Sequence, residues 1–116
     1  MNSITRIAPG TRMSGAVVHG DTVYLAGHVD GTHSPTVTTQ TRAILAKIDE
    51  RLAVAGTDKS RLLSATIWLT DIATFEEMNA VWDAWVDPAN LPARATVEAR
   101  LASPDYLVEI AVIAAR

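Results

Sequence analysis

The sequence contains no cysteine among its 116 residues. This absence excludes disulfides, thiolate chemistry and zinc sites with cysteine ligands, and it fits a cytoplasmic location. The chain also lacks a surplus of positive charge, because 10 Lys and Arg stand against 13 Asp and Glu. With a net charge of −3, binding to nucleic acid without sequence preference is disfavoured, and we expect no nucleic-acid partner.

Long apolar runs, internal repeats and low-complexity segments are missing as well. No run is long enough to span a bilayer, and the first residues lack the basic and apolar regions of a signal sequence. We therefore expect no membrane association. Hydrophobic residues still make up 48% of the chain, which is enough for one small core. We interpret residues 1–116 as a single domain.

The N-terminal part of the sequence predicts strands. Ile4 and Ile7 indicate a short first strand. Residues 16–19 and 22–25 then flank Gly20-Asp21, a dipeptide that is typical of a tight hairpin turn.

Two helices are predicted further along. After a loop, Ser34-Pro35 supplies a cap and a proline at the first helical position, and Gly56 ends this first helix. Thr74-Phe-Glu-Glu77 matches a capping box that would start the second helix. The apolar stripes that we expect to face the core are Ile44, Leu45, Ile48 and Leu52 in the first helix and Met78, Val81, Trp82 and Trp85 in the second.

The remaining segments predict three more strands. Residues 63–70 alternate, with Leu63, Ala65, Ile67 and Leu69 on the apolar face, and residues 94–101 alternate similarly. From Leu107 to Ala115 nearly every position is apolar, so this strand should be central and covered on both faces. Because two helices cover only one face of a sheet, the pattern predicts an α+β layer in a homo-oligomer.

Glu109 is the only polar side chain between Leu107 and Ala115. Burying a charge is costly unless it is paired. Arg94 is a candidate partner, because the planar fork of arginine binds a carboxylate through two parallel hydrogen bonds. Two interpretations stay open at this point: a structural ion pair at a subunit interface, or a small-molecule site.

Several stretches of the sequence carry a family resemblance. They are Gly20-Asp-Thr-Val-Tyr-Leu-Ala-Gly27, Leu63-Ser-Ala-Thr-Ile-Trp-Leu-Thr-Asp71, Phe75-Glu-Glu-Met-Asn79, and Pro92-Ala-Arg94 with Val108-Glu109-Ile110. Over nearly its whole length the chain resembles the Rid (YjgF/YER057c/UK114) family. Arg12-Met-Ser and residues 78–85 look closest to its YoaB-like branch.

The resemblance implies a chorismate-mutase-like fold and a homotrimer with sites in clefts between subunits. The best-studied branch of the family hydrolyses 2-imino or 2-enamino acids to 2-keto acids and ammonia, without a metal or cofactor. In that branch the residues that match Arg94 and Glu109 bind the substrate carboxylate and orient the attacking water. The resemblance also places Gly27 and the backbone carbonyl of Thr96 against the substrate.

The chain departs from the family pattern in its polar pocket residues. Ala26 stands where the family has a serine, Met13 where it has a tyrosine, and Thr96 where it has a cysteine. Two functions therefore stay open: deaminase activity, or binding of a small carboxylate-bearing metabolite without turnover. Endoribonuclease activity, a label that some family members carry, fits the acidic charge balance less well.

His28 follows Gly27 and is expected to line the same pocket. His28, Asp30 and His33 allow a second interpretation as metal ligands, but their spacing matches no strong metal motif. We therefore expect no metal site.

Overall fold

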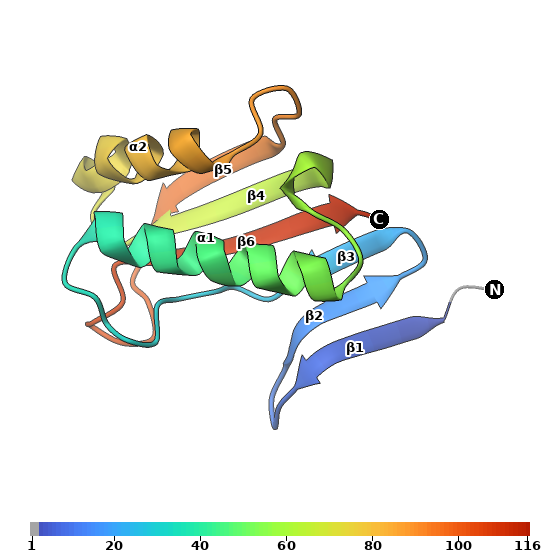
Figure 1. Ribbon diagram of the computed structural model, residues 1–116. Coiled ribbons are helices and arrows are strands. Elements are labelled where there is room, and N and C mark those ends of the chain that lie inside the picture. The colour runs from blue at the N-terminus through green and yellow to red at the C-terminus, as the bar shows by residue number, and fades with distance from the viewer. Residues whose placement is uncertain (1–2) are drawn as a thin grey trace.

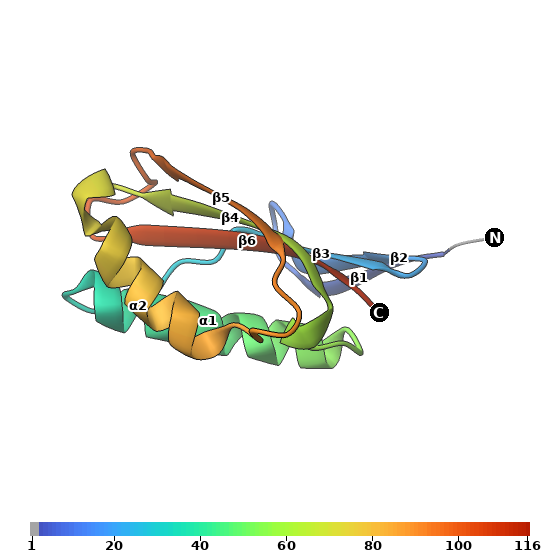
Figure 2. The same ribbon diagram turned by 90° about the horizontal axis from the view of Figure 1, so that it is seen from above.

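A mixed six-stranded sheet carries both helices on one face in the computed structural model, which describes residues 3–116 (Figures 1 and 2). Single 3-10 turns, η1 (Lys59–Arg61) and η2 (Ile72–Thr74), precede β4 and α2. This arrangement confirms the predicted α+β class. The strands are β1 (Ile4–Pro9), β2 (Ser14–His19), β3 (Thr22–Leu25), β4 (Leu62–Leu69), β5 (Ala93–Glu98) and β6 (Val108–Ala115), and the helices are α1 (Val37–Val54) and α2 (Phe75–Trp85).

Strand β6 lies inside the sheet, whose order is β1-β2-β3-β6-β4-β5. All neighbouring pairs are antiparallel except β4 and β5, which are parallel and are joined by the crossover through α2. A parallel pair needs such a long connection, because its second strand starts at the same edge as the first. The last strand is therefore central, as its composition predicts, while β1 and β5 form the two edges.

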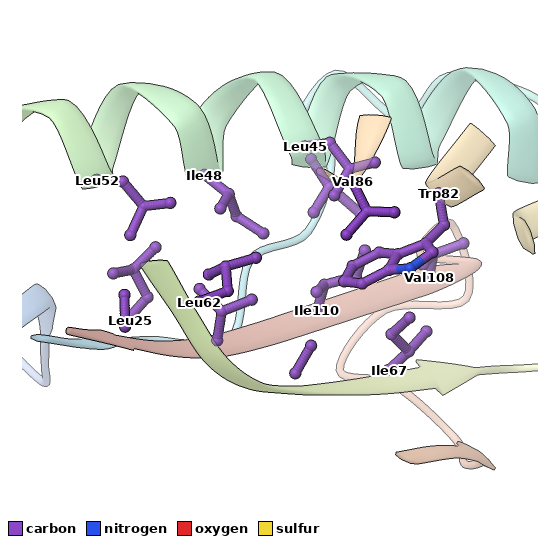
Figure 3. Packing of buried hydrophobic residues seen from close by; sticks show 14 of the residues in the cluster. Leu25, Leu45, Ile48, Leu52, Leu62, Ile67, Trp82, Val86, Val108 and Ile110 are labelled. Carbon is purple, nitrogen blue, oxygen red and sulfur yellow. The ribbon is translucent and has the colours of Figure 1, made fainter. Parts of the chain in front are cut away.

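The hydrophobic core fills the space between the helices and the sheet (Figure 3). Both apolar stripes predicted for the helices point into it, although Trp85 is only partly buried. Burial of each large side chain stabilises the fold by about 1.5–3 kcal/mol. From β6 the core receives Val108, Ile110, Val112 and Ala114, whereas the residues between them are only half-buried. Within residues 3–116 no element covers the second face of β6, so its predicted coverage on both faces stays a prediction that depends on a second copy.

The first helix begins two residues later than predicted. Thr36, not Ser34, is the N-cap: its side chain accepts a hydrogen bond from the Thr39 N–H, and Thr39 reciprocates at the Thr36 backbone. Ser34 is held in the preceding loop, where its N–H donates to Asp30 Oδ2 and its carbonyl accepts from Gln40. Two residues of cap-forming type, separated by Pro35, therefore compete, and the loop contacts of Ser34 decide between them.

The capping box predicted for the second helix is also wrong. The Thr74 hydroxyl donates to the Asp71 carbonyl and makes no cap hydrogen bond, because residues 72–74 form a 3-10 turn ahead of α2. Glu77 instead accepts hydrogen bonds from the backbone and hydroxyl of Thr38, at 2.9 and 3.0 Å. Glu77 therefore joins the start of α1 to the start of α2.

Two strand predictions need correction. A register shift between Leu62 and Ser64 in the pairing with β6 buries Leu62 and leaves Leu63 51% exposed, so Leu63 is not on the core face. Strand β5 ends at Glu98 rather than at residue 101. The Ala99 N–H still donates to the Leu69 carbonyl, but β4 ends there and offers no further partner.

Candidate functional site

Glu109 lies on the sheet face that carries no helix. Its neighbours Val108 and Ile110 point into the core, and Glu109 itself is half-buried on the opposite face. Its register partner on β4 is Trp68, whose partner on β5 is Val97. The carboxylate thus stands in a row with two apolar side chains, and within residues 3–116 it forms no ion pair.

Gly27 leaves the space that the Glu109 carboxylate occupies. A Cβ atom at position 27 would overlap Glu109 Oε2 and would lie 3.0 Å from Cδ. Gly27 follows β3, just before His28 bridges to Ile110. The structure therefore brings together Gly27 and Glu109, two of the residues that the resemblance assigns to one pocket.

Arg94 lies on the other face of the sheet. Its register partner on β4 is Ala65, which is buried beneath the helices. The Arg94 Cζ atom lies 5.3 Å from the ring centroid of Trp82 and 5.7 Å from that of Phe75, both on α2. No carboxylate of residues 3–116 forms an ion pair with it. The side chain borders a cavity of about 280 Å³, together with Asn79, Trp82, Leu91 and Pro92 among others.

Arg94 and Glu109 therefore do not meet within one chain. They point to opposite faces of the sheet, on β5 and β6, with β4 between them. An ion pair inside the subunit is excluded by this arrangement. A site that uses both residues needs two copies of the chain, each contributing one of them.

The other predicted pocket residues are divided between these two places. Thr96 is the register partner of Ile67, so it faces the helices like Arg94, and its buried hydroxyl has no hydrogen-bond partner among the described residues. Ala26 is half-buried next to Gly27, and its N–H donates to the Gly15 carbonyl at 3.0 Å. Met13 is 64% exposed, just before β2.

His28 points toward the helices and away from Glu109. It bridges to Ile110 on the core side and is 9% exposed. Its Nδ1–H donates to the Ala26 carbonyl at 2.7 Å. Burial lowers the pKa of His28, the bond to Ala26 partly offsets this effect, and the nearby positive charges of Arg51 and Lys47 lower the pKa further. The imidazole is therefore neutral at physiological pH and acts as a support beneath the Gly27 segment.

Two polar side chains fix the loops that flank these residues. Asp30 is 4% exposed and accepts hydrogen bonds from the Thr32 and Ser34 backbone and from the Thr32 hydroxyl. Burial alone would raise the pKa of Asp30, but these hydrogen bonds hold that pKa at about 2. The Gln40 side chain, fully buried, donates to the Ser34 and Asp105 carbonyls and accepts from the Leu107 N–H. Gln40 thus holds the residues that lead into β6.

Sequence reasoning missed the surroundings of Arg94 and Glu109. Phe75 was assigned no role and Trp82 only a core role, yet both rings contact Arg94. Trp68 lies next to Glu109, which the alternation of residues 63–70 alone did not predict. The alternation along each strand indicates which residues share a face of the sheet. The neighbours of a residue on that face follow only when the strand order is known.

Neither a cluster of metal ligands nor a membrane-spanning helix is found among residues 3–116. Among residues 3–116, no group of three or more acidic or histidine side chains is placed to hold a metal ion. His28 and Asp30 have the local hydrogen bonds described above, and His33 lies 3.6 Å from Asp105. In the same part of the chain, neither helix combines the length and apolar character needed to cross a membrane.

Comparisons with known proteins agree with one another. The family model described as Endoribonuclease L-PSP matches residues 3–116. A RutC family protein of Haemophilus ducreyi is 46% identical over 112 residues, covering 97% of this chain and 96% of its own. The RutC family protein YoaB of Escherichia coli is 42% identical over 113 residues, covering 97% and 98%.

Solved structures that match this chain include members of the YjgF and Rid families. A member of the YjgF protein family from Neisseria meningitidis matches with a TM-score of 0.96 at 43% identity, covering 98% of this chain and 95% of that one. A protein of the Rid family from Yersinia pestis matches with a TM-score of 0.90 at 27% identity, covering 98% and 100%.

Proposed function

The chain belongs to the Endoribonuclease L-PSP family, that of the YjgF and Rid proteins, and from this premise we propose that it hydrolyses 2-imino or 2-enamino acids to 2-keto acids and ammonia. One observation carries the proposal. Arg94 and Glu109 each lack an ion-pair partner within residues 3–116, and they lie on opposite faces of the sheet. Each is one half of a site that a neighbouring copy would complete.

The helix-free face of the sheet supports the assembly that this proposal requires. Tyr24 and Val97 are 45% and 46% exposed on that face, and Trp68 and Ile113 are half-buried there. A large apolar surface of this kind is typical of a protein interface. In the proposed homotrimer these faces meet, and the β5 edge of one copy lies next to the Gly27–Glu109 segment of another.

The proposed reaction uses the residues in separate roles. Arg94 binds the substrate carboxylate through its fork and so positions the carbon–nitrogen double bond. Glu109 of the neighbouring copy holds a water and accepts its proton as the oxygen bonds to C2 of the protonated imine. That proton then passes to the nitrogen. As the C–N bond breaks and ammonia leaves, Glu109 accepts the proton of the C2 hydroxyl, the carbonyl of the 2-keto acid forms, and the released ammonia takes up this proton as ammonium. General-base help of this kind contributes about 10²- to 10⁴-fold.

An amino-acid oxidase that generates imine in the assay provides the test. The wild-type protein should accelerate release of the keto acid, and Arg94→Ala and Glu109→Gln should abolish the acceleration. Lys47→Ala, which removes an exposed charge on α1, is the matched control and should behave as wild type. If the wild type accelerates nothing, or if Arg94→Ala is equally active, the proposal fails.

A second candidate function is binding of a small carboxylate without turnover. It is favoured by Ala26 and Met13, which place no hydroxyl where the family pattern has a serine and a tyrosine. Thermal stabilisation by a 2-keto acid, lost in Arg94→Ala and unaccompanied by imine hydrolysis, would support this function instead. A ligand at 100 times its Kd stabilises a protein by about 2.7 kcal/mol, which a melting curve detects readily.

A further inference from the structure

Two aromatic rings of α2 hold the guanidinium of Arg94. The Cζ atom lies over both rings, 5.3 Å from the Trp82 centroid and 5.7 Å from the Phe75 centroid. Cation–π attraction acts within about 6 Å of a ring centroid. No carboxylate of residues 3–116 reaches ion-pair distance of Arg94, so aromatic contact takes the place that an acidic partner usually fills.

The kind of contact determines which hydrogen-bond donors of Arg94 remain available to a ligand. The N–H donors of a guanidinium lie in its plane, and its attraction to an aromatic ring does not use them. An acidic partner would occupy the same donors that a ligand carboxylate needs. Aromatic contact therefore restrains the side chain while its two-pronged donor edge stays available.

The rings are themselves fixed by the fold. Phe75 and Trp82 are seven residues apart, two turns along α2, and so project from the same side of the helix. Trp82 is 4% exposed and Phe75 packs against the core cluster. Neither ring can move far without disturbing that packing. The helix thus presents two fixed surfaces to one flexible side chain at the β5 edge.

We propose that Phe75 and Trp82 are positioning residues that orient Arg94 for capture of a ligand carboxylate. This inference rests on the proposed function, because it takes Arg94 as the group that binds the carboxylate. It adds that affinity depends on the rings that restrain the arginine as well as on its charge. Loss of one ring should weaken carboxylate binding by roughly three- to tenfold, the effect of one cation–π contact.

Calorimetric titration with pyruvate, the smallest 2-keto acid, tests the inference on the full chain. Phe75→Leu keeps an apolar side chain but removes the ring, and Phe75→Tyr keeps the ring. We expect the Kd for pyruvate to rise roughly three- to tenfold in Phe75→Leu and to stay within twofold of wild type in Phe75→Tyr. Trp82→Leu and Trp82→Phe form a second pair with the same expectation. Pyruvamide, the uncharged analogue, should show no difference between members of a pair.

Combination with Arg94→Ala separates positioning from a general loss of structure. If Phe75 acts through Arg94, the Phe75→Leu change should have no further effect on pyruvate binding once Arg94 is removed. In the ligand-free protein, the Arg94 Nε–H proton signal should carry a ring-current shift that Phe75→Leu reduces and Phe75→Tyr preserves. This second readout does not depend on ligand binding.

The outcomes distinguish the two claims. If wild type binds pyruvate through Arg94 but both leucine variants bind equally well, the positioning inference is overturned and the proposed function stands. If wild type does not bind pyruvate, or binds it without Arg94, the role of Arg94 fails and the inference built on it fails too. If the losses in the leucine variants persist without Arg94, the rings act through general packing and the inference is overturned.

Discussion

The Glu109 carboxylate packs directly against the backbone of Gly27, in the space that a side chain at position 27 would fill. A methyl group at that position would overlap Oε2. Glycine at position 27 thus decides where the only carboxylate of β6 can point. This contact is made within one chain, whereas a contact between Glu109 and Arg94 would require another copy.

Gly27→Ala should separate activity from stability. The added Cβ meets the far end of a flexible side chain, so the carboxylate can rotate away and stability should change by less than about 1 kcal/mol. A displaced carboxylate no longer holds the water, and imine hydrolysis should fall at least about tenfold. Gly31→Ala, where the added Cβ meets no atom within 4 Å, is the control and should keep full activity. Full activity in Gly27→Ala would contradict the assigned role of Glu109.

The lowered pKa of His28 predicts that the protein loses stability in mildly acid solution. Burial lowers its pKa in the folded protein below the ordinary value of 6.5. The unfolded chain therefore binds a proton more readily, and the free energy of unfolding should decrease as the pH falls through about 6.5. Urea unfolding at pH 7.5 and pH 5.5 measures this difference. His28→Asn, which retains a donor for the Ala26 carbonyl, should lose less stability over the same range; an equal loss would show that His28 does not cause it.

The ionised carboxylate of Asp30 should contribute to the free energy of unfolding down to a much lower pH than neutral His28 does. Its pKa of about 2 in the folded protein lies below the ordinary 3.8. The stabilisation is therefore complete above about pH 3.8 and disappears as the pH falls toward 2. Asp30→Asn should cost about 1–3 kcal/mol at pH 7, the effect of weakening hydrogen bonds to a buried charge. Glu50→Gln, on the exposed side of α1, should cost almost nothing. Equal unfolding energies for these two variants at pH 7 would refute the prediction.

The apolar positions of the sequence predicted the elements well and their ends poorly. Period-two and helical spacing located the strands and both helices, because burial of those side chains dominates the stability of each element. The start of α1 was wrong, since Ser34 and Thr36 are both cap-forming residues and the contact of Ser34 with Asp30 excludes the first. The start of α2 at Phe75 was predicted, but its capping hydrogen bonds were not. The exposure of Leu63 follows from a register shift, which no local pattern reveals.

The sequence predicted a set of candidate site residues but not how they are arranged. The family resemblance, which the comparisons confirm, identified Arg94, Glu109 and Gly27. It did not show that Arg94 faces the helices, because alternation in β5 would place Ala95 and Val97 inward. At this edge strand the inward positions instead meet the rings of α2. Which face is inward depends on strand order and helix placement, and both are properties of the whole fold.

The helix-free face should control assembly. Ile113 is half-buried on this face of β6, opposite Tyr24 of β3. Ile113→Lys would place a charge in the proposed interface, where its desolvation is costly. We expect this variant to sediment as a monomer and to lose imine hydrolysis with it. Ala53→Lys, on the exposed surface of α1, should leave the assembly intact. An unchanged sedimentation coefficient for Ile113→Lys would mean that this face is not the interface.

The most direct test of a site shared between copies is complementation between two inactive variants. Arg94→Ala and Glu109→Gln chains, each inactive alone, are unfolded together in equal amounts, refolded as mixed oligomers and assayed for imine hydrolysis. If one copy supplies Arg94 and its neighbour supplies Glu109, about one quarter of the sites should regain both residues, since half of the chains carry each intact group. Activity near that fraction of wild type is the predicted result. No recovered activity in mixed oligomers of confirmed composition would contradict a site built from two copies.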